Sequence, residues 1–115
     1  MVAPRSLLLD CDPGVDDALA IALALASPEV KLEAITVVAG NCAVDRATGN
    51  ALRVVETCHG LAPWEVSPLP PVYRGASRPL RGGEKGGAGA GVGDAEFVHG
   101  PGGLGGVGEM RGLGG

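Results

Sequence analysis

The distribution of glycine limits, more than any other feature, where this chain can fold. Of its 21 glycines, 4 lie in residues 1–60 and 17 in residues 61–115. A glycine-rich backbone loses much entropy on ordering, and it offers few large apolar side chains to bury. We therefore expect the first half to carry the helices and strands. The second half should be largely irregular, with a disordered low-complexity loop at residues 82–95.

The start of the chain reads as a strand followed by a helix. Residues 6–11 are a short apolar run, typical of a parallel strand that is buried on both faces. Pro13 and Gly14 end this run. Residues 18–27 are apolar on all sides and precede Pro28, which predicts a buried helix that ends there.

A second strand and helix follow. Residues 31–40 are rich in β-branched side chains and predict a strand. Residues 43–60 carry apolar side chains at helical spacing, and the polar residues of this helix are expected mostly on its other side: Asp45, Arg46, Asn50, Arg53 and Glu56. Strands joined through a helix are parallel with a right-handed crossover, so the predicted fold class is α/β, a Rossmann-like βαβα unit. A short third strand is predicted at residues 72–73.

Four aspartates crowd the first strand-to-helix turn, namely Asp10, Asp12, Asp16 and Asp17. Turn formation and first-turn helix positions explain one such residue more easily than four. Their mutual repulsion calls for a cation or a set of hydrogen-bond donors. Because all the candidate ligands are hard oxygens, Ca²⁺ or Mg²⁺ is favoured over zinc, although the spacing is not that of an EF-hand.

Asn41 should lie near these aspartates. It follows the second predicted strand, and the carboxyl ends of parallel strands share one edge of the sheet, where ligands bind.

A strand followed by an Asp-x-Asp turn also resembles the haloacid dehalogenase phosphatases. Asp16 and Asp17 have no place in that pattern and would repel a phosphate.

The composition argues against several classes of protein. A net charge of −4 and a pI of about 5.0 disfavour binding to nucleic acid, and no basic run suits an anionic membrane. The longest apolar run, at residues 18–26, is far shorter than the roughly 20 residues that span a bilayer. Cys11, Cys42 and Cys58 have no CxxC spacing and lie among apolar residues, which predicts reduced, buried thiols in a cytoplasmic protein.

Several motifs together resemble one family. The segment DCDPGVDDALAI at residues 10–21 resembles the signature of the inosine-uridine preferring nucleoside hydrolases. Four further segments are similar to that family in the same order: AITVVAGN at 34–41, ATGNALRVVE at 47–56, PPVYRGASRPLRG at 70–82 and VHGPGGLG at 98–105. The resemblance assigns residues 1–81 to the N-terminal part of the hydrolase domain. Residues 96–115 would be a partial nucleobase-side segment with an irregular tail.

The resemblance implies hydrolysis of the N-glycosidic bond of ribonucleosides, of the inosine or uridine type, to ribose and a free base. A Ca²⁺-activated water would be the nucleophile, with Asp12 as its base. The implied metal ligands are Asp10, Asp12 and Asp17. The implied substrate-binding residues are Asp16 and Asn41 at the ribose, and His99 near the nucleobase.

Family members are much longer, and their remaining metal and ribose contacts have no counterpart here. We therefore expect a fragment, a truncated product or a faulty gene model, weak or inactive by itself. The alternative is a non-catalytic metal- or ribose-binding remnant that docks onto a longer paralogue. Full-length members are expected to form homo-oligomers, whereas the oligomeric state and nucleobase preference of this chain stay open.

Overall fold

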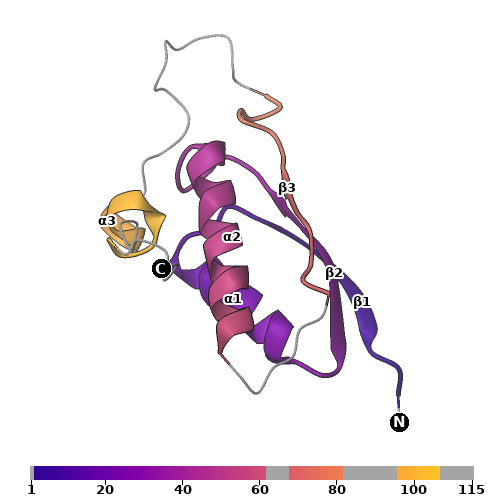
Figure 1. Ribbon diagram of the computed structural model, residues 1–115. Coiled ribbons are helices and arrows are strands. Elements are labelled where there is room, and N and C mark those ends of the chain that lie inside the picture. The colour runs from indigo at the N-terminus through magenta and orange to yellow at the C-terminus, as the bar shows by residue number, and fades with distance from the viewer. Residues whose placement is uncertain (1, 62–67, 82–95, 107–115) are drawn as a thin grey trace.

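A computed structural model describes residues 2–61, 68–81 and 96–106 of the chain (Figure 1). It contains β1 (Arg5–Cys11), α1 (Val15–Ala26), β2 (Val30–Val37), α2 (Val44–Gly60) and β3 (Val72–Arg74). Two short turns of helix follow, α3 (Glu96–His99) and η1 (Pro101–Gly103). The predicted α/β fold is confirmed, and each predicted strand and helix is present. The loop predicted at residues 82–95 and the end of the tail lie outside the described residues.

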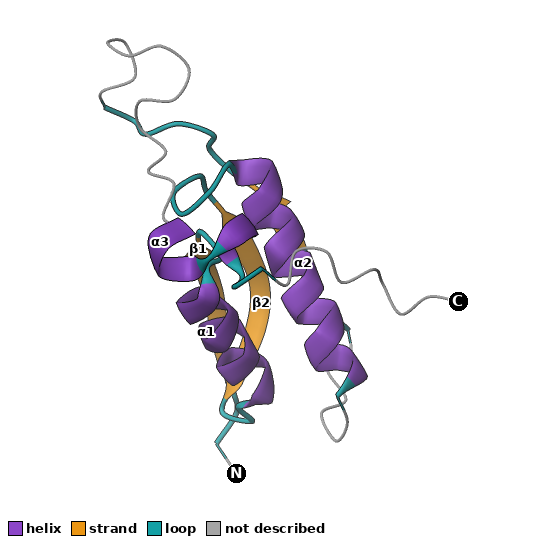
Figure 2. Cartoon of the chain, turned by 90° about the vertical axis from the view of Figure 1, so that its left-hand side faces the viewer, coloured by secondary structure: helices purple, strands orange, loops and turns teal. Residues whose placement is uncertain are grey.

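The three strands form one parallel sheet with β2 at its centre, in the order β1-β2-β3. Helices α1 and α2 lie on the same face of this sheet (Figure 1, Figure 2). This follows from two successive right-handed crossovers that step in one direction across the sheet. The carboxyl ends of β1 and β2 consequently lie side by side beneath the start of α1.

The core fills the space between the sheet and these two helices. Ile35 and Val37 of β2 and Ile21 of α1 are fully buried. Helix α2 contributes a stripe with a spacing of four residues, at Ala47, Ala51 and Val55. The predicted apolar face of α2 is thus confirmed, and Cys11, Cys42 and Cys58 are buried thiols, as expected.

Two predictions of burial are wrong. Leu8 in β1 is 72% exposed, although the strand was expected to be buried on both faces. Leu19 and Leu23 in α1 are 68% and 69% exposed, although that helix was expected to be buried all round. In the described part of the chain, helices cover only one face of the sheet, and nothing covers the outer side of α1. The local apolar character was correctly identified, but the elements needed to bury it on every side are not among the described residues.

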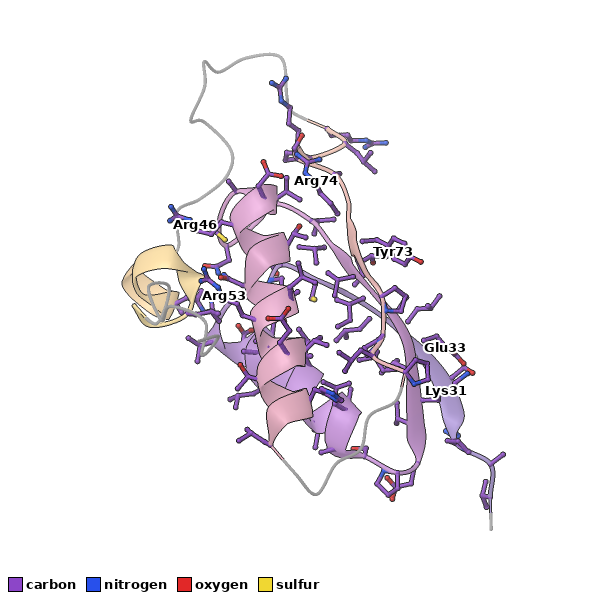
Figure 3. The ribbon with its side chains drawn as sticks, viewed as in Figure 1. Lys31, Glu33, Arg46, Arg53, Tyr73 and Arg74 are labelled. Atoms are coloured by element: carbon purple, nitrogen blue, oxygen red, sulfur yellow. The ribbon has the colours of Figure 1, made fainter. Side chains whose placement is uncertain are left out.

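Polar pairs occupy the helix-free face and the far edge of the sheet. Glu33 accepts a hydrogen bond from Ser6 Oγ and pairs with Lys31 Nζ, both at 2.9 Å, and Lys31, Glu33 and Tyr73 project away from α2 (Figure 3). At the other end, Arg74 Nε donates to Asp45 Oδ1 at 2.5 Å and joins β3 to the start of α2. These pairs are solvent-exposed, so they contribute little to stability.

None of the helices in the described residues is both long enough and apolar enough to cross a bilayer.

Candidate active site

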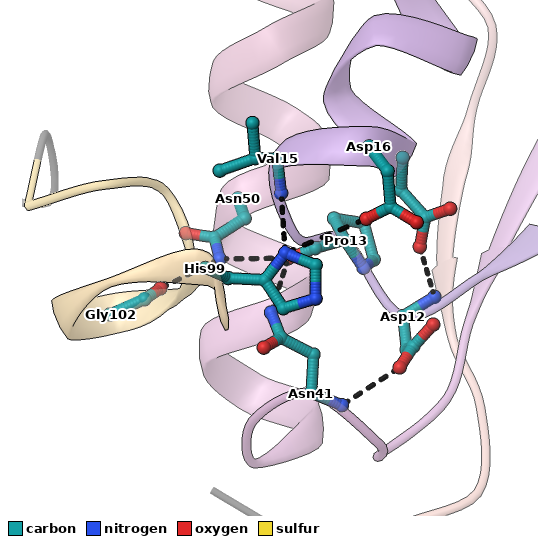
Figure 4. A network of polar contacts seen from close by, with 9 residues as sticks. Asp12, Pro13, Val15, Asp16, Asn41, Asn50, His99 and Gly102 are labelled. Atoms are coloured by element: carbon teal, nitrogen blue, oxygen red, sulfur yellow. Dashed lines mark hydrogen bonds and ion pairs between the residues drawn. The ribbon is translucent and has the colours of Figure 1, made fainter. Parts of the chain in front are cut away.

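The predicted proximity of Asn41 to the aspartates is confirmed. Strand β2 ends at Val37, earlier than predicted, and the backbone bends at residues 39–41. The Asn41 N–H then donates to Asp12 Oδ2 at 2.8 Å (Figure 4). The Asp12 N–H donates to Asp17 Oδ2 at 3.1 Å. Asp12 is therefore fixed between the start of α1 and the loop after β2.

Gly40 makes room for this arrangement. A Cβ atom at Gly40 would overlap Oδ2 of Asp12 and would lie 2.9 Å from its Cγ. Real Cβ atoms do not approach other heavy atoms so closely, so the Asp12 carboxylate can occupy its position only because residue 40 lacks a side chain. The Gly-Asn pair thus serves Asp12 twice, by leaving space for the carboxylate and by donating a hydrogen bond to it.

The electrostatic environment of the turn is negative. Burial raises the pKa of the Asp17 carboxyl, the Asp12 N–H lowers it in part, and the charges of Asp16 and Asp12 raise it further. Burial, followed by the nearby carboxylates, raises the pKa of the Cys11 thiol to about 12. Within the described residues, neither Asp12 nor Asp17 forms an ion pair with a basic side chain. In the described residues, no basic side chain therefore neutralises the carboxylates of Asp12 and Asp17.

Asp10 points elsewhere. It lies opposite Thr36 in the sheet register and accepts a hydrogen bond from Thr36 Oγ1 at 2.6 Å. Because side chains alternate along a strand, Asp10 lies on the helix-free face, whereas its neighbour Cys11 points into the core. No hydrogen bond in the described residues joins the Asp10 carboxylate to Asp12 or Asp17.

The donor set fits a hard cation in its chemistry, but it is incomplete. Asp12 and Asp17 supply carboxylate oxygens from one short turn, in a field that favours positive charge. No group of three or more histidine, cysteine, aspartate or glutamate residues within residues 2–61, 68–81 and 96–106 could hold a metal ion. Since Ca²⁺ takes about 6–8 oxygen ligands, these residues would form one side of such a site.

His99 comes from far along the chain to the same turn. Val15 N–H donates to His99 Nδ1 at 3.2 Å, and Nδ1 lies 3.6 Å from Asp16 Oδ1. Val15 opens α1, so its N–H has no acceptor within the helix, and the imidazole supplies one. A Cβ atom at Gly14 would lie 2.6 Å from His99 Nδ1, so the ring lies directly against this glycine.

Asn41 also brings an unsatisfied acceptor to the site. Its side chain is buried, and its Nδ2 donates to Pro13 O at 3.3 Å. Its Oδ1 is buried with no hydrogen-bond partner in the described residues. An unpaired buried acceptor costs about 1–3 kcal/mol, so this oxygen needs a donor that the described residues do not provide.

Asn50 belongs to the candidate site, and its predicted place on the polar side of its helix is wrong. It was expected on the polar side of α2, but it is only 2% exposed. Its Nδ2 donates to Pro13 O at 3.2 Å and to Gly102 O at 2.9 Å. Its spacing carried the signal, because it lies three residues after Ala47 and four before Val54, within the buried stripe.

Comparison with known proteins identifies the family. The family model described as inosine-uridine preferring nucleoside hydrolase matches residues 7–112. The chain belongs to this family. The match covers the turn, the Gly-Asn pair, Asn50 and the segment that carries His99.

Individual relatives agree with this assignment. The inosine-uridine preferring nucleoside hydrolase of Leishmania major is 41% identical over 104 residues, which are 90% of this chain and 28% of that protein. The non-specific ribonucleoside hydrolase RihC of Salmonella agona is 40% identical over 104 residues, 90% of this chain and 29% of that protein. The chain thus spans less than a third of the length of these relatives.

Solved structures of nucleoside hydrolases match the fold as well. The plant nucleoside hydrolase PpNRh1 superposes with a TM-score of 0.69 at 39% identity, over 90% of this chain and 28% of that one. An inosine-guanosine nucleoside hydrolase superposes with a TM-score of 0.58 at 38% identity, over 69% of this chain and 21% of that one. The parallel sheet with its two helices is therefore a part of the nucleoside hydrolase fold.

Proposed function

We propose that this chain forms one side of the active site of a Ca²⁺-dependent nucleoside hydrolase. The reaction is hydrolysis of the N-glycosidic bond of inosine- or uridine-type ribonucleosides to ribose and the free base. One observation carries the proposal: Asp12 and Asp17 meet at a single turn, joined to Asn41, with no basic side chain of the described residues paired to them.

Asp12 and Asp17 would hold the cation. Asp10, the third predicted ligand, would support the site from the helix-free face through its bond to Thr36. When bound, the cation would supply positive charge that lowers the pKa of the attacking water towards neutral pH.

Asp12 would act as the base. The N–H of Asn41 fixes one carboxylate oxygen of Asp12, which orients the carboxylate and leaves the other oxygen to take a proton from water. Breaking the glycosidic bond produces an oxocarbenium-like ribosyl group, and the nearby negative charge of Asp12, Asp16 and Asp17 stabilises it.

The substrate would be held by residues around the turn. The exposed Asp16 would bind one ribose hydroxyl, and the unsatisfied Oδ1 of Asn41 would accept a hydrogen bond from another. His99 would lie near the nucleobase. A site that pairs buried polar groups with ribose hydroxyls discriminates against 2′-deoxynucleosides, since these leave such groups unpaired.

Because the opposite side of the site is not among the described residues, we expect little or no turnover from the 115-residue chain alone. The buried thiols favour a cytoplasmic location. The exposed leucines of α1 and the edge strands β1 and β3 favour association with another chain.

A thermal-shift titration with Ca²⁺ tests the cation site. Binding at 100 times the dissociation constant should stabilise the wild-type chain by about 2.7 kcal/mol, and Asp12→Asn and Asp17→Asn should lose this response. Asp45→Asn is the matched control, because it removes one carboxylate charge from α2 away from the turn and should keep the response. A wild-type chain that millimolar Ca²⁺ does not stabilise would overturn the proposal.

The alternative is a non-catalytic metal- or ribose-binding remnant that docks onto a longer paralogue, favoured by the exposed Leu8, Leu19 and Leu23. Assays with inosine, uridine and p-nitrophenyl riboside separate the two functions. The chain is tested as a fusion to the C-terminal part of a longer relative, which supplies the opposite side of the site. Turnover by this fusion that Asp12→Asn abolishes supports a hydrolase, whereas Ca²⁺ binding without turnover by the fusion supports the remnant.

A further inference from the structure

Asn50 connects the two segments that carry the site. One N–H of its side chain meets the carbonyl of Pro13, between Asp12 and Gly14, at 3.2 Å. The same nitrogen donates at 2.9 Å to the carbonyl of Gly102, three residues after His99. Pro13 and Gly102 are far apart in sequence, so this amide crosslinks the signature turn to the histidine segment through the middle of α2 (Figure 4).

Gly103 allows the histidine segment to approach this amide. Its φ is +84°, a value that side-chain-bearing residues rarely adopt. A Cβ atom there would lie 2.6 Å from Asn41 Nδ2 and 3.2 Å from Asn50 Nδ2. The backbone at Gly103 therefore lies against both amides, and a side chain at this position would push the segment away from them.

Backbone hydrogen bonds within residues 99–105 link the position of Gly102 to that of His99. Gly105 N–H donates to His99 O at 2.6 Å, and Gly103 N–H donates to Gly100 O at 3.0 Å. These bonds close residues 99–105 into a tight unit, with Gly102 bound to Asn50 at one side and His99 against Gly14 at the other. Fixing the Gly102 carbonyl therefore also fixes where the imidazole lies.

We infer that Asn50 is a positioning residue of the site: by holding the Pro13 and Gly102 carbonyls together, it seats His99 on Gly14, where the imidazole accepts the Val15 N–H beside Asp16. Its importance for a ribonucleoside site rests on the proposed function. The Asn50 amide is directed at the Pro13 and Gly102 carbonyls, so it would act through the position of His99. An apolar side chain would fill the same stripe of α2, but it would leave the Gly102 carbonyl without its donor.

Amide hydrogen exchange of the whole chain, read by NMR, tests this inference without substrate. The reporter is the Val15 amide, whose only acceptor in the described residues is His99 Nδ1. The Ala18 amide, bonded to Gly14 O at 3.0 Å in the same helix turn, is the internal reference. Asn50→Ala and Asn50→Asp should speed Val15 exchange by about tenfold while Ala18 changes by less than about twofold.

A control separates positioning from general destabilisation. Ala51→Gly weakens the same helix at the next buried residue and removes no donor, so it should leave the ratio of Val15 to Ala18 exchange unchanged. The imidazole ¹⁵N shifts of His99 should change in the Asn50 variants, with His59 of the same chain as the reference. Equal changes in Ala51→Gly, or unchanged Val15 and His99 signals in the Asn50 variants, would overturn the inference.

A second variant covers the case in which the Asn50 variants do not fold. Gly103→Ala keeps the Asn50 amide but adds the Cβ atom that would displace the histidine segment. It should give the same Val15 and His99 changes, and a Gly103→Ala protein with wild-type signals would overturn the inference.

An inosine titration in Ca²⁺ keeps the two proposals apart. Inosine should shift the His99 resonances of the wild-type chain, and less so in Asn50→Ala. If inosine shifts no wild-type resonance, the proposed function fails, while the exchange experiment still decides the contacts of Asn50. If inosine shifts His99 equally in both proteins, the positioning role fails and the proposed function stands.

Discussion

Replacing Gly40 by alanine should disable the site while leaving the fold intact. The new Cβ atom would overlap Oδ2 of Asp12 and would lie 2.9 Å from Cγ and 3.1 Å from Cβ of the same side chain. Three atoms of Asp12 thus stand in its way, and the carboxylate must rotate out of its position. Rotation breaks its hydrogen bond from the Asn41 N–H, which is 2.8 Å long.

The expected cost follows from that bond. A hydrogen bond to a charged group contributes about 1.5–3 kcal/mol, and the buried Asn41 N–H loses its partner as well. Overpacking adds little, because the partly exposed Asp12 side chain can move towards solvent. A loss of about 2 kcal/mol lowers the melting temperature of a domain of this size by about 8–16 °C.

Gly49→Ala is a matched control that should raise the melting temperature, whereas Gly40→Ala should lower it. Gly49 lies inside α2, and a Cβ atom there would meet nothing within 4 Å. Alanine is better than glycine in a helix interior by about 0.8–1.0 kcal/mol, so this variant should melt higher than wild type.

Melting curves measured by circular dichroism, with and without Ca²⁺, check both expectations. The ¹⁵N–¹H resonance of Asn41 should move in Gly40→Ala and stay in place in Gly49→Ala. A Gly40→Ala chain that keeps the wild-type melting temperature, Ca²⁺ response and Asn41 resonance would refute the steric reasoning.

Three further predictions concern charge and burial. Since the folded state raises the pKa of Asp17, the unfolding free energy should fall as pH rises from the ordinary aspartate pKa through the raised one. Asp17→Asn should remove this loss and stabilise the metal-free chain at neutral pH, which urea titrations at several pH values measure. Burial also raises the pKa of the Cys58 thiol, so iodoacetamide at pH 8 should modify it much more slowly in the folded chain than in urea. Finally, Ile21→Ala should cost about 2–5 kcal/mol, whereas Leu23→Lys on the exposed side of the same helix should change stability by less than about 0.5 kcal/mol.

The secondary structure was predictable because it rests on local pattern. The apolar run of β1, the β-branched residues of β2 and the spacing of Ala47, Ala51 and Val55 each specify one element. Burial of Leu8 and Leu19 was predicted wrongly, because burial depends on which elements lie outside them. Apolar residues identify a surface suited to burial, but they do not identify what covers it.

The site was predictable where the topology alone brings residues together. Asn41 reaches Asp12 because parallel strands end at one edge. Asn50 is buried although it is polar, because its place in α2 follows the spacing of the apolar residues. The alternation of side chains along β1 could have indicated that Asp10 faces away from the core, since it precedes the buried Cys11.

Glycine shows how composition and geometry differ in what they reveal. The many glycines of residues 61–115 indicated a segment with few apolar side chains to bury. Three individual glycines instead make room for neighbouring side chains. A Cβ atom at Gly14 would strike His99, and one at Gly40 would strike Asp12. A Cβ atom at Gly103 would strike the amides of Asn41 and Asn50. At each of these three positions a polar side chain of the candidate site occupies the space that a Cβ would take, so these glycines make room for that site.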